Sequence, residues 1–130
     1  MRLCPLILLV RLAALWMLAA VPSQGLGQAT TTRVSVSTSG AQGVGRSGDP
    51  VVSADGRFVL FTSAATNLVA SDTNASDDAF VRDLVLGTTS RVSVASNGAE
   101  ANSLSLASGI SSDGRFVTFL SIANNLVAQD

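Results

Sequence analysis

Residues 52–61 read V-S-A-D-G-R-F-V-L-F, and residues 110–119 read I-S-S-D-G-R-F-V-T-F. In each stretch an Asp-Gly pair, which is typical of a tight turn, precedes a short run that is apolar on both faces. The two Asp-Gly pairs are 58 residues apart, since 113 − 55 = 58. The spacing therefore predicts two copies of one unit that is built from short strands.

The similarity between the copies extends well beyond these stretches. Residues 31–72 and 89–130 agree at 22 of 42 positions without a gap. Internal repetition on this scale is typical of repeat architectures. We assign repeat 1 to residues 31–88 and a truncated repeat 2 to residues 89–130. Because nothing in the second copy corresponds to residues 73–88, we expect the chain to be a fragment of a longer protein.

Each copy is predicted to contain short strands and no helix. Residues 33–37 alternate polar and apolar side chains, as a half-buried strand does. Residues 57–63 are apolar on both faces, which indicates a strand that is covered on both sides. A polar loop is expected at residues 67–78. Strands are expected at residues 33–37, 51–53, 57–63, 79–85 and 90–95. This pattern predicts an all-β, antiparallel fold.

The two quoted stretches resemble the repeat signature of the TolB-type, WD-repeat-like β-propeller family, as does D-A-F-V-R-D at residues 78–83. Ala54 and Ser112 stand where the family often carries Pro. The resemblance implies four-stranded antiparallel propeller blades, incomplete in this chain. It also implies a strand order, from the inside outward, of residues 51–53, 57–63, 79–84 and 90–94. Residues 33–36 would form an outermost strand that precedes its own blade.

The N-terminal residues 1–29 are predicted to be a secretory signal peptide. They combine a positive start, an apolar segment at residues 6–21 and small residues before a cleavage site. We expect cleavage after Ala29, with an alternative near Gly25. A retained membrane anchor is the competing interpretation. It is disfavoured because the apolar segment contains Arg11 and is shorter than the roughly 20 residues that a spanning helix needs.

Signal cleavage would leave residues 30–130, the β-propeller repeat region, without a stable membrane span. We expect this product to be secreted, periplasmic or on the cell surface, and the family resemblance implies a bacterial source. Its six Arg and nine acidic residues give a formal charge of 6 − 9 = −3, which disfavours nucleic acid as a partner. It contains no Cys, His or Lys, so it has no disulfide and no conventional catalytic triad. We therefore expect a protein that is not an enzyme.

One loop has the composition of a calcium site. Its oxygen-bearing residues alternate as in the first half of a calcium-binding loop, and an Asp stands at the twelfth position. Asp77 occupies the position where such loops need Gly. The alternative is a solvated loop whose side chains form Asx-turns. The candidate calcium ligands are Asp72, Asn74, Ser76, Asp78 and Asp83.

These features predict an exported, non-enzymatic β-propeller segment that serves as a binding scaffold in the cell envelope or outside the cell. Its expected partner is a protein, a peptide or a glycan. The remaining propeller blades, or a second copy of the chain, are expected to cover its open faces. Two alternatives remain: the propeller part of a larger exported hydrolase whose active site lies beyond residue 130, and a calcium-stabilised surface or adhesion repeat.

Overall fold

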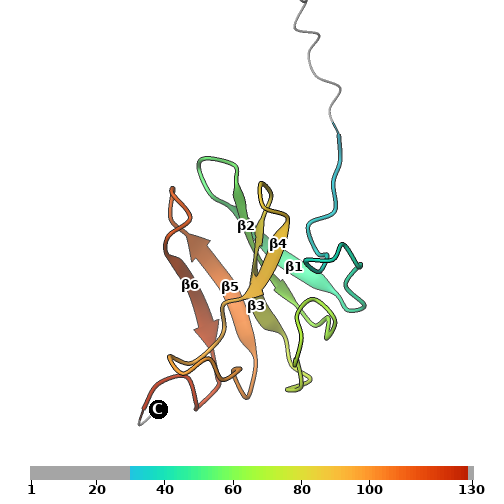
Figure 1. Ribbon diagram of the computed structural model, residues 1–130. Helices are drawn as coiled ribbons and strands as arrows, with labels where there is room; N and C mark the ends of the chain where they lie inside the picture. The colour runs from blue at the N-terminus through green and yellow to red at the C-terminus, as the bar shows by residue number, and fades with distance from the viewer. Residues whose placement is uncertain (1–29, 129–130) are drawn as a thin grey trace, which may run out of the picture. The chain divides into compact units, whose positions relative to one another are not determined.

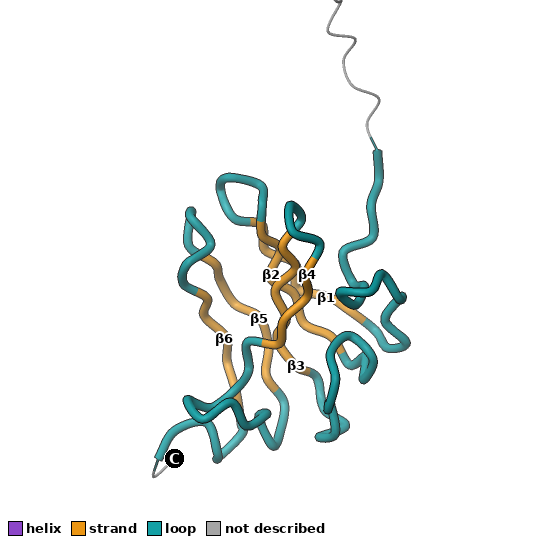
Figure 2. Tube along the Cα trace, viewed as in Figure 1, coloured by secondary structure: helices purple, strands orange, loops and turns teal. Residues whose placement is uncertain are grey.

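The computed structural model describes residues 30–128, so the predicted signal peptide at residues 1–29 lies outside the described residues. Six strands form two antiparallel sheets, and the described residues contain no helix (Figures 1 and 2). This confirms the predicted all-β, antiparallel class. None of the described residues forms a helix long and apolar enough to cross a membrane. The strands are β1 (Ser47–Val52), β2 (Phe58–Ser63), β3 (Asp78–Asp83), β4 (Thr88–Arg91), β5 (Ser105–Ile110) and β6 (Val117–Ser121).

The first sheet contains β1, β2, β3 and β4 in the order of the sequence, and each neighbouring pair is antiparallel. This is the strand order that was expected, although β1 begins several residues earlier than predicted. The β2–β3 pairing is continuous over six residue pairs, from Phe58 opposite Asp83 to Ser63 opposite Asp78. Short turns join β1 to β2 and β3 to β4, whereas β2 and β3 pair across the longer connection of residues 64–77. Strands that are consecutive in sequence usually lie side by side.

The Asp-Gly turns form as the sequence predicts. In the β1–β2 turn, the Asp55 carboxylate accepts hydrogen bonds from the Ser53 hydroxyl and the Arg57 amide, and Gly56 has φ +71°. Asp113 and Gly114 repeat this geometry between β5 and β6, where Gly114 has φ +70°. Glycine adopts such positive φ values without a steric penalty. The turn therefore follows directly from the local sequence.

The core of the first sheet lies between β2, β3 and the loop that follows β2. The rings of Phe61 and Phe80 are stacked with centroids 5.8 Å apart. Ala65 and Leu68 complete this buried cluster. Leu68 belongs to the connection that was expected to be a polar loop, yet it is only 2% exposed. Burying such a side chain stabilises the fold by roughly 1.5–3 kcal/mol.

The second sheet is the β5–β6 hairpin, and β5 lies against β1, β2 and β3 (Figure 1). The pairing registers shift between Gly48 and Val51 in β1 and between Ala107 and Gly109 in β5. Each shift marks one extra residue on the first strand of its hairpin, which is a β-bulge. The two hairpins therefore share a turn and a bulge at equivalent places, 58 residues apart.

The strand expected at residues 33–37 is wrong. Only Val36 pairs, with Gln42, and its amide donates to the carbonyl of Val34 at 2.8 Å. The segment folds back on itself, because local hydrogen bonds replace the ladder of a sheet. The predicted strand at residues 90–95 ends early, at Arg91, for the same reason: Val94 pairs with Glu100 in a second loop of this kind.

Candidate functional site

The predicted calcium residues meet an arginine that the sequence analysis did not single out. Arg91 ends β4, and its Nη1 lies 2.8 Å from Glu100 Oε2, 3.2 Å from Asp78 Oδ2 and 3.5 Å from Asp72 Oδ1. The Asp78 side chain is fully buried, and those of Asp72 and Arg91 are nearly so. We call Arg91 and these three carboxylates the Arg91 network.

Two of the three carboxylates are well satisfied. Asp78 accepts a 2.7 Å hydrogen bond from the Ser93 hydroxyl and a 3.0 Å hydrogen bond from Asn74 Nδ2. Glu100 accepts hydrogen bonds from both the hydroxyl and the amide of Thr73. The bonds from Thr73, together with the charge of Arg91, hold the pKa of Glu100 below its ordinary value. These contacts tie the loop before β3 to the loop after β4.

Asp72 is the unsatisfied member of the network. Its buried Oδ1 accepts no hydrogen bond, and the buried Nε of Arg91 donates none. Burial raises the pKa of the Asp72 carboxyl above its ordinary value. The negative charge of Asp78 raises that pKa further, and the charge of Arg91 opposes both effects. One guanidinium thus faces three carboxylates, and Asp72 is the one whose ionised form is disfavoured.

Two other predicted calcium ligands, Asn74 and Ser76, form the local hydrogen bonds expected of a solvated loop with Asx-turns. Asn74 Oδ1 accepts from the Ser76 amide at 2.9 Å, which is an Asx-turn. The Ser76 hydroxyl contacts the Asn74 carbonyl oxygen at 3.3 Å. Asn74 turns its amide nitrogen, a donor, toward the network. Within residues 30–128, no group of three His, Cys, Asp or Glu side chains is arranged to hold a metal.

Asp83 lies apart from the other candidate ligands, because the second half of the proposed loop is strand β3. Asp78 and Asp83 stand at opposite ends of β3, about 17 Å apart at the usual rise per residue. They cannot share one ion. Asp83 instead binds Arg57, whose Nε lies 3.1 Å and Nη2 2.7 Å from Asp83 Oδ2. This bond, with two backbone amides, lowers the pKa of Asp83 from 3.8 to about 2.

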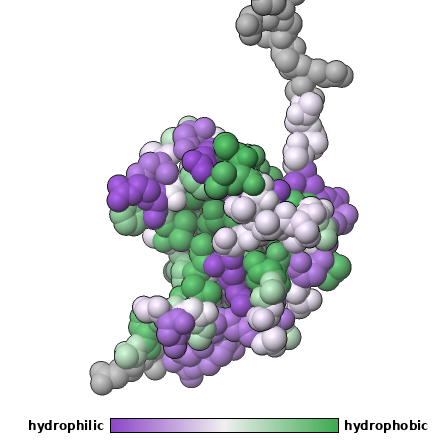
Figure 3. All heavy atoms as spheres, in the orientation of Figure 1, coloured by the Kyte–Doolittle hydropathy of each residue, from purple (hydrophilic) through white to green (hydrophobic). Residues whose placement is uncertain are grey.

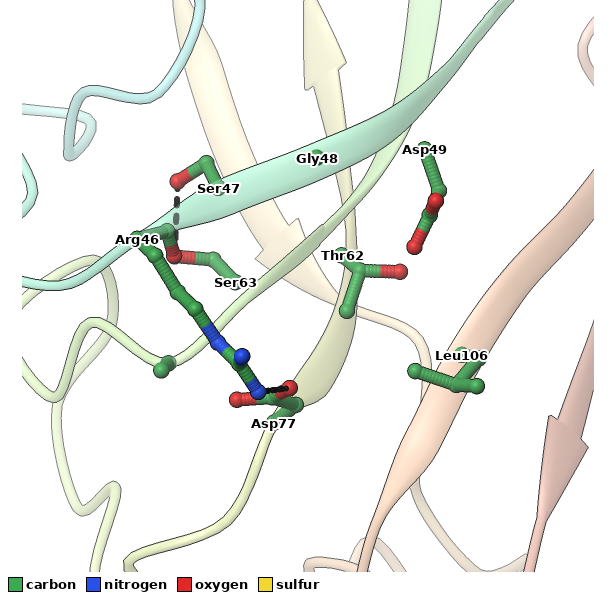
Figure 4. Close-up of a pocket in the computed structure, with 9 residues that line it drawn as sticks. Arg46, Ser47, Gly48, Asp49, Thr62, Ser63, Asp77 and Leu106 are labelled. Carbon is green, nitrogen blue, oxygen red and sulfur yellow. Dashed lines mark hydrogen bonds and ion pairs between the residues drawn. The ribbon is translucent and has the colours of Figure 1, made fainter.

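A polar cleft of about 310 Å³ lies between β1, β2 and β5 (Figure 4). Arg46 and Asp77 form an ion pair at its rim. Asp49 projects from the β1 bulge with φ +50°, an uncommon value for a residue other than glycine. The cleft offers carboxylates, hydroxyls and a guanidinium, but no nucleophile paired with a base. Its lining residues are Arg46, Ser47, Gly48, Asp49, Thr62, Ser63, Ala64, Asp77 and Leu106.

The β5–β6 hairpin is attached to the first sheet through specific contacts. The Ala107 amide donates to Thr62 Oγ1 at 2.9 Å, and the Ser105 amide donates to the Asp77 carbonyl at 2.8 Å. The Phe58 ring lies against Gly114 in the β5–β6 turn. As a result, the face of β2 that carries Phe58 and Thr62 is covered by the second hairpin.

Comparison with protein-family models, curated proteins and solved structures found no match to this chain. The β-propeller resemblance therefore stays a prediction, and function is argued from the contacts of the chain itself.

The outer face of the β5–β6 hairpin is apolar and open. Phe116 is 66% exposed, Leu120 69% and Ile122 73%. The equivalent face of β2 is covered, and Thr62, which is equivalent to Leu120, is only 5% exposed. Apolar residues reach the surface beside polar ones on the side drawn in Figure 3. Sequence reasoning expected open faces in general, but the exposed fractions identify this surface. We call Phe116, Leu120 and Ile122 the open face.

Proposed function

We propose that this chain is an exported, non-enzymatic interaction scaffold and that its four-stranded sheet is a propeller-type blade. The blade assignment is supported by the strand order β1-β2-β3-β4 and by hydrogen bonds that recur after 58 residues. The Ser53 amide donates to the Phe58 carbonyl at 2.9 Å, and the Ser111 amide donates to the Phe116 carbonyl at 2.8 Å.

One observation carries the proposal: nearly the same strand sequence is buried in one sheet and exposed in the other. Residues 58–63 read F-V-L-F-T-S, and residues 116–121 read F-V-T-F-L-S. In β2, Phe61 is 2% and Thr62 5% exposed, whereas in β6 the equivalent Phe119 is half-buried and the equivalent Leu120 is 69% exposed. Several exposed apolar residues on one face of a strand are typical of an interaction site. The partner that fits such a surface best is a polypeptide.

The non-enzymatic part of the proposal rests on the chemistry of the described side chains. Residues 30–128 contain no His, Cys or Lys. The most acidic places are the Arg91 network and the cleft, and in both an arginine neutralises a carboxylate. A carboxylate held by a guanidinium is a poor general base, because its lone pairs are engaged. Export rests on the signal-peptide features of residues 1–29.

Site-specific photo-crosslinking tests the scaffold function. A photoreactive amino acid replaces Leu120 on the open face in cells that secrete the protein. The matched control replaces Val44, which lies between two glycines before β1 and is 75% exposed. We expect crosslinks to polypeptide from position 120 and none from position 44. Equal crosslinking at both positions, or none at either, would contradict the proposal. N-terminal sequencing of the secreted product tests export, with Thr30 as the expected first residue.

A further inference from the structure

Within residues 30–128, the strand β6 has one edge without a partner. In this part of the chain β6 pairs only with β5, whereas its counterpart β2 lies between β1 and β3. The Ile122 amide donates to the Leu104 carbonyl, and the Phe116 carbonyl accepts from the Ser111 amide. The backbone groups of the even-numbered residues therefore form hydrogen bonds toward β5. Because hydrogen bonds alternate along an antiparallel strand, the amides of Val117, Phe119 and Ser121 point to the free edge.

The pairing of β2 with β3 shows what a strand of this sequence binds at that edge. Phe61 stands opposite Phe80, and their rings stack. Asp83, three residues after Phe80, stands opposite Phe58. Its carboxylate accepts hydrogen bonds from Nε and Nη2 of Arg57, the residue before Phe58. An aromatic ring and a carboxylate, three residues apart, thus occupy fixed places along the edge of β2.

The same two binding elements are present on β6. Phe119 is equivalent to Phe61, and Arg115 is equivalent to Arg57. Arg115 lies 5.5 Å over the ring of Phe116, as Arg57 lies 4.7 Å over the ring of Phe58. Among the described residues, Arg57 has an acidic partner and Arg115 has none. The free edge of β6 therefore carries an aromatic ring and a cation at the positions equivalent to those that β3 contacts on β2.

Resting on the proposed scaffold function, we propose that the free edge of β6 binds an extended polypeptide segment by antiparallel strand addition. The segment carries an aromatic residue opposite Phe119 and, three residues later, a carboxylate that pairs with Arg115. Main-chain hydrogen bonds provide affinity in this mode of recognition, and the side-chain positions provide specificity.

The composition of β6 supports this assignment. Soluble proteins usually protect an edge strand with a charged residue, a proline or a bulge. Residues 117–121 read V-T-F-L-S and contain neither a charge nor a proline, and the bulge of this hairpin lies on β5. An edge of this kind is suited to pairing with another strand. The charge complementarity at Arg115 selects a segment with an acidic residue over a purely apolar one.

The test uses a synthetic peptide with the sequence of residues 76–86, S-D-D-A-F-V-R-D-L-V-L, which contains β3. The full-length protein is titrated with this peptide while amide hydrogen exchange is followed by NMR. We expect new protection at Val117, Phe119 and Ser121, with no change at Thr118 and Leu120. Intermolecular nuclear Overhauser effects should place Phe80 of the peptide opposite Phe119. A peptide in which Phe80 and Asp83 are both replaced by Ala is expected not to bind.

Matched variants test the role of the cation. Arg115→Gln is expected to weaken peptide binding roughly tenfold, because it removes a charged hydrogen-bond donor. The control variant Arg33→Gln removes the charge of another exposed arginine and should leave binding unchanged. Equal weakening by the two variants would reduce the effect to nonspecific electrostatics and contradict the specific pairing.

Other occupants of the edge give different results. Protection of the three amides in the free protein that is lost on dilution would show a second copy on β6, and protection at every concentration would show another part of the chain. Either result, or an absence of peptide binding, overturns strand addition by an acidic-aromatic segment. Crosslinking from position 120 would then still support the scaffold function, so the two proposals fail separately.

Discussion

Phe58 in the first sheet lies directly against Gly114 in the turn of the second. A Cβ atom at Gly114 would overlap the Phe58 ring, since it would lie 2.9 Å from Cγ and closer still to the ring-edge carbons. The equivalent Gly56 has the same backbone conformation, but a Cβ atom there would meet nothing within 4 Å. The turn alone therefore accounts for Gly56, whereas packing between the sheets also requires a glycine at position 114.

These two glycines form a matched pair for a stability measurement. Gly56→Ala should cost about 1–2 kcal/mol, because alanine is strained at positive φ. Gly114→Ala should cost roughly 1–3 kcal/mol more, because the added methyl group forces the Phe58 ring to move. Urea unfolding of both variants measures the difference. Equal losses of stability would show that the two sheets do not pack through this contact.

The ion pair between Asp83 and Arg57 should make stability depend on pH in the acid range. The folded-state pKa of Asp83 is lowered from 3.8 to about 2, chiefly by the Arg57 side chain. A depressed pKa stabilises the fold fully above pH 4, and this contribution is lost as the pH falls toward 2. Asp83→Asn should flatten this part of the pH–stability profile, measured by urea unfolding. An unchanged profile would contradict the pairing.

The carboxylates of Asp72 and Asp78 face the same arginine but should respond oppositely to substitution. Asp72 has a raised pKa, so its ionised form destabilises the fold as the pH rises above the ordinary aspartate pKa. We expect Asp72→Asn to raise the thermal midpoint at neutral pH. Asp78→Ala should lower stability by about 1–3 kcal/mol, because Ser93 and Arg91 lose a buried acceptor. Differential scanning calorimetry compares the two variants, and shifts in the same direction would contradict this description.

Calcium addition tests the calcium-stabilised alternative. We expect millimolar calcium, and separately EDTA, to leave the thermal midpoint of the full-length protein unchanged, because the Arg91 guanidinium lies among the carboxylates that would bind the ion. A calcium-dependent rise that Asp72→Asn abolishes would reverse this expectation. It would also support the surface or adhesion repeat.

Much of the fold could be predicted because its signals are local. The Asp-Gly turns and the apolar run of β2 follow from short stretches of sequence, whereas the strand order of the first sheet was expected from the family resemblance. The expected strand at residues 33–37 failed, although its alternation is regular. Alternation shows which side chains share a face, but it does not show whether a neighbouring strand is available. In this case Val36 finds its partner six residues away, at Gln42.

The candidate site was harder to predict because its members are distant in sequence. The calcium pattern grouped Asp78 with Asp83, but a strand holds them at opposite ends, and Asp78 meets Arg91 and Ser93 instead. The sequence by itself determined the all-β class, the turns and the recurrence of nearly the same strand sequence at β2 and β6. Only the tertiary structure decided that β2 is buried while β6 keeps an open edge. Burial depends on which segments pack together in space, and among the described residues β2 has a strand on each side while β6, of nearly the same sequence, has one on a single side.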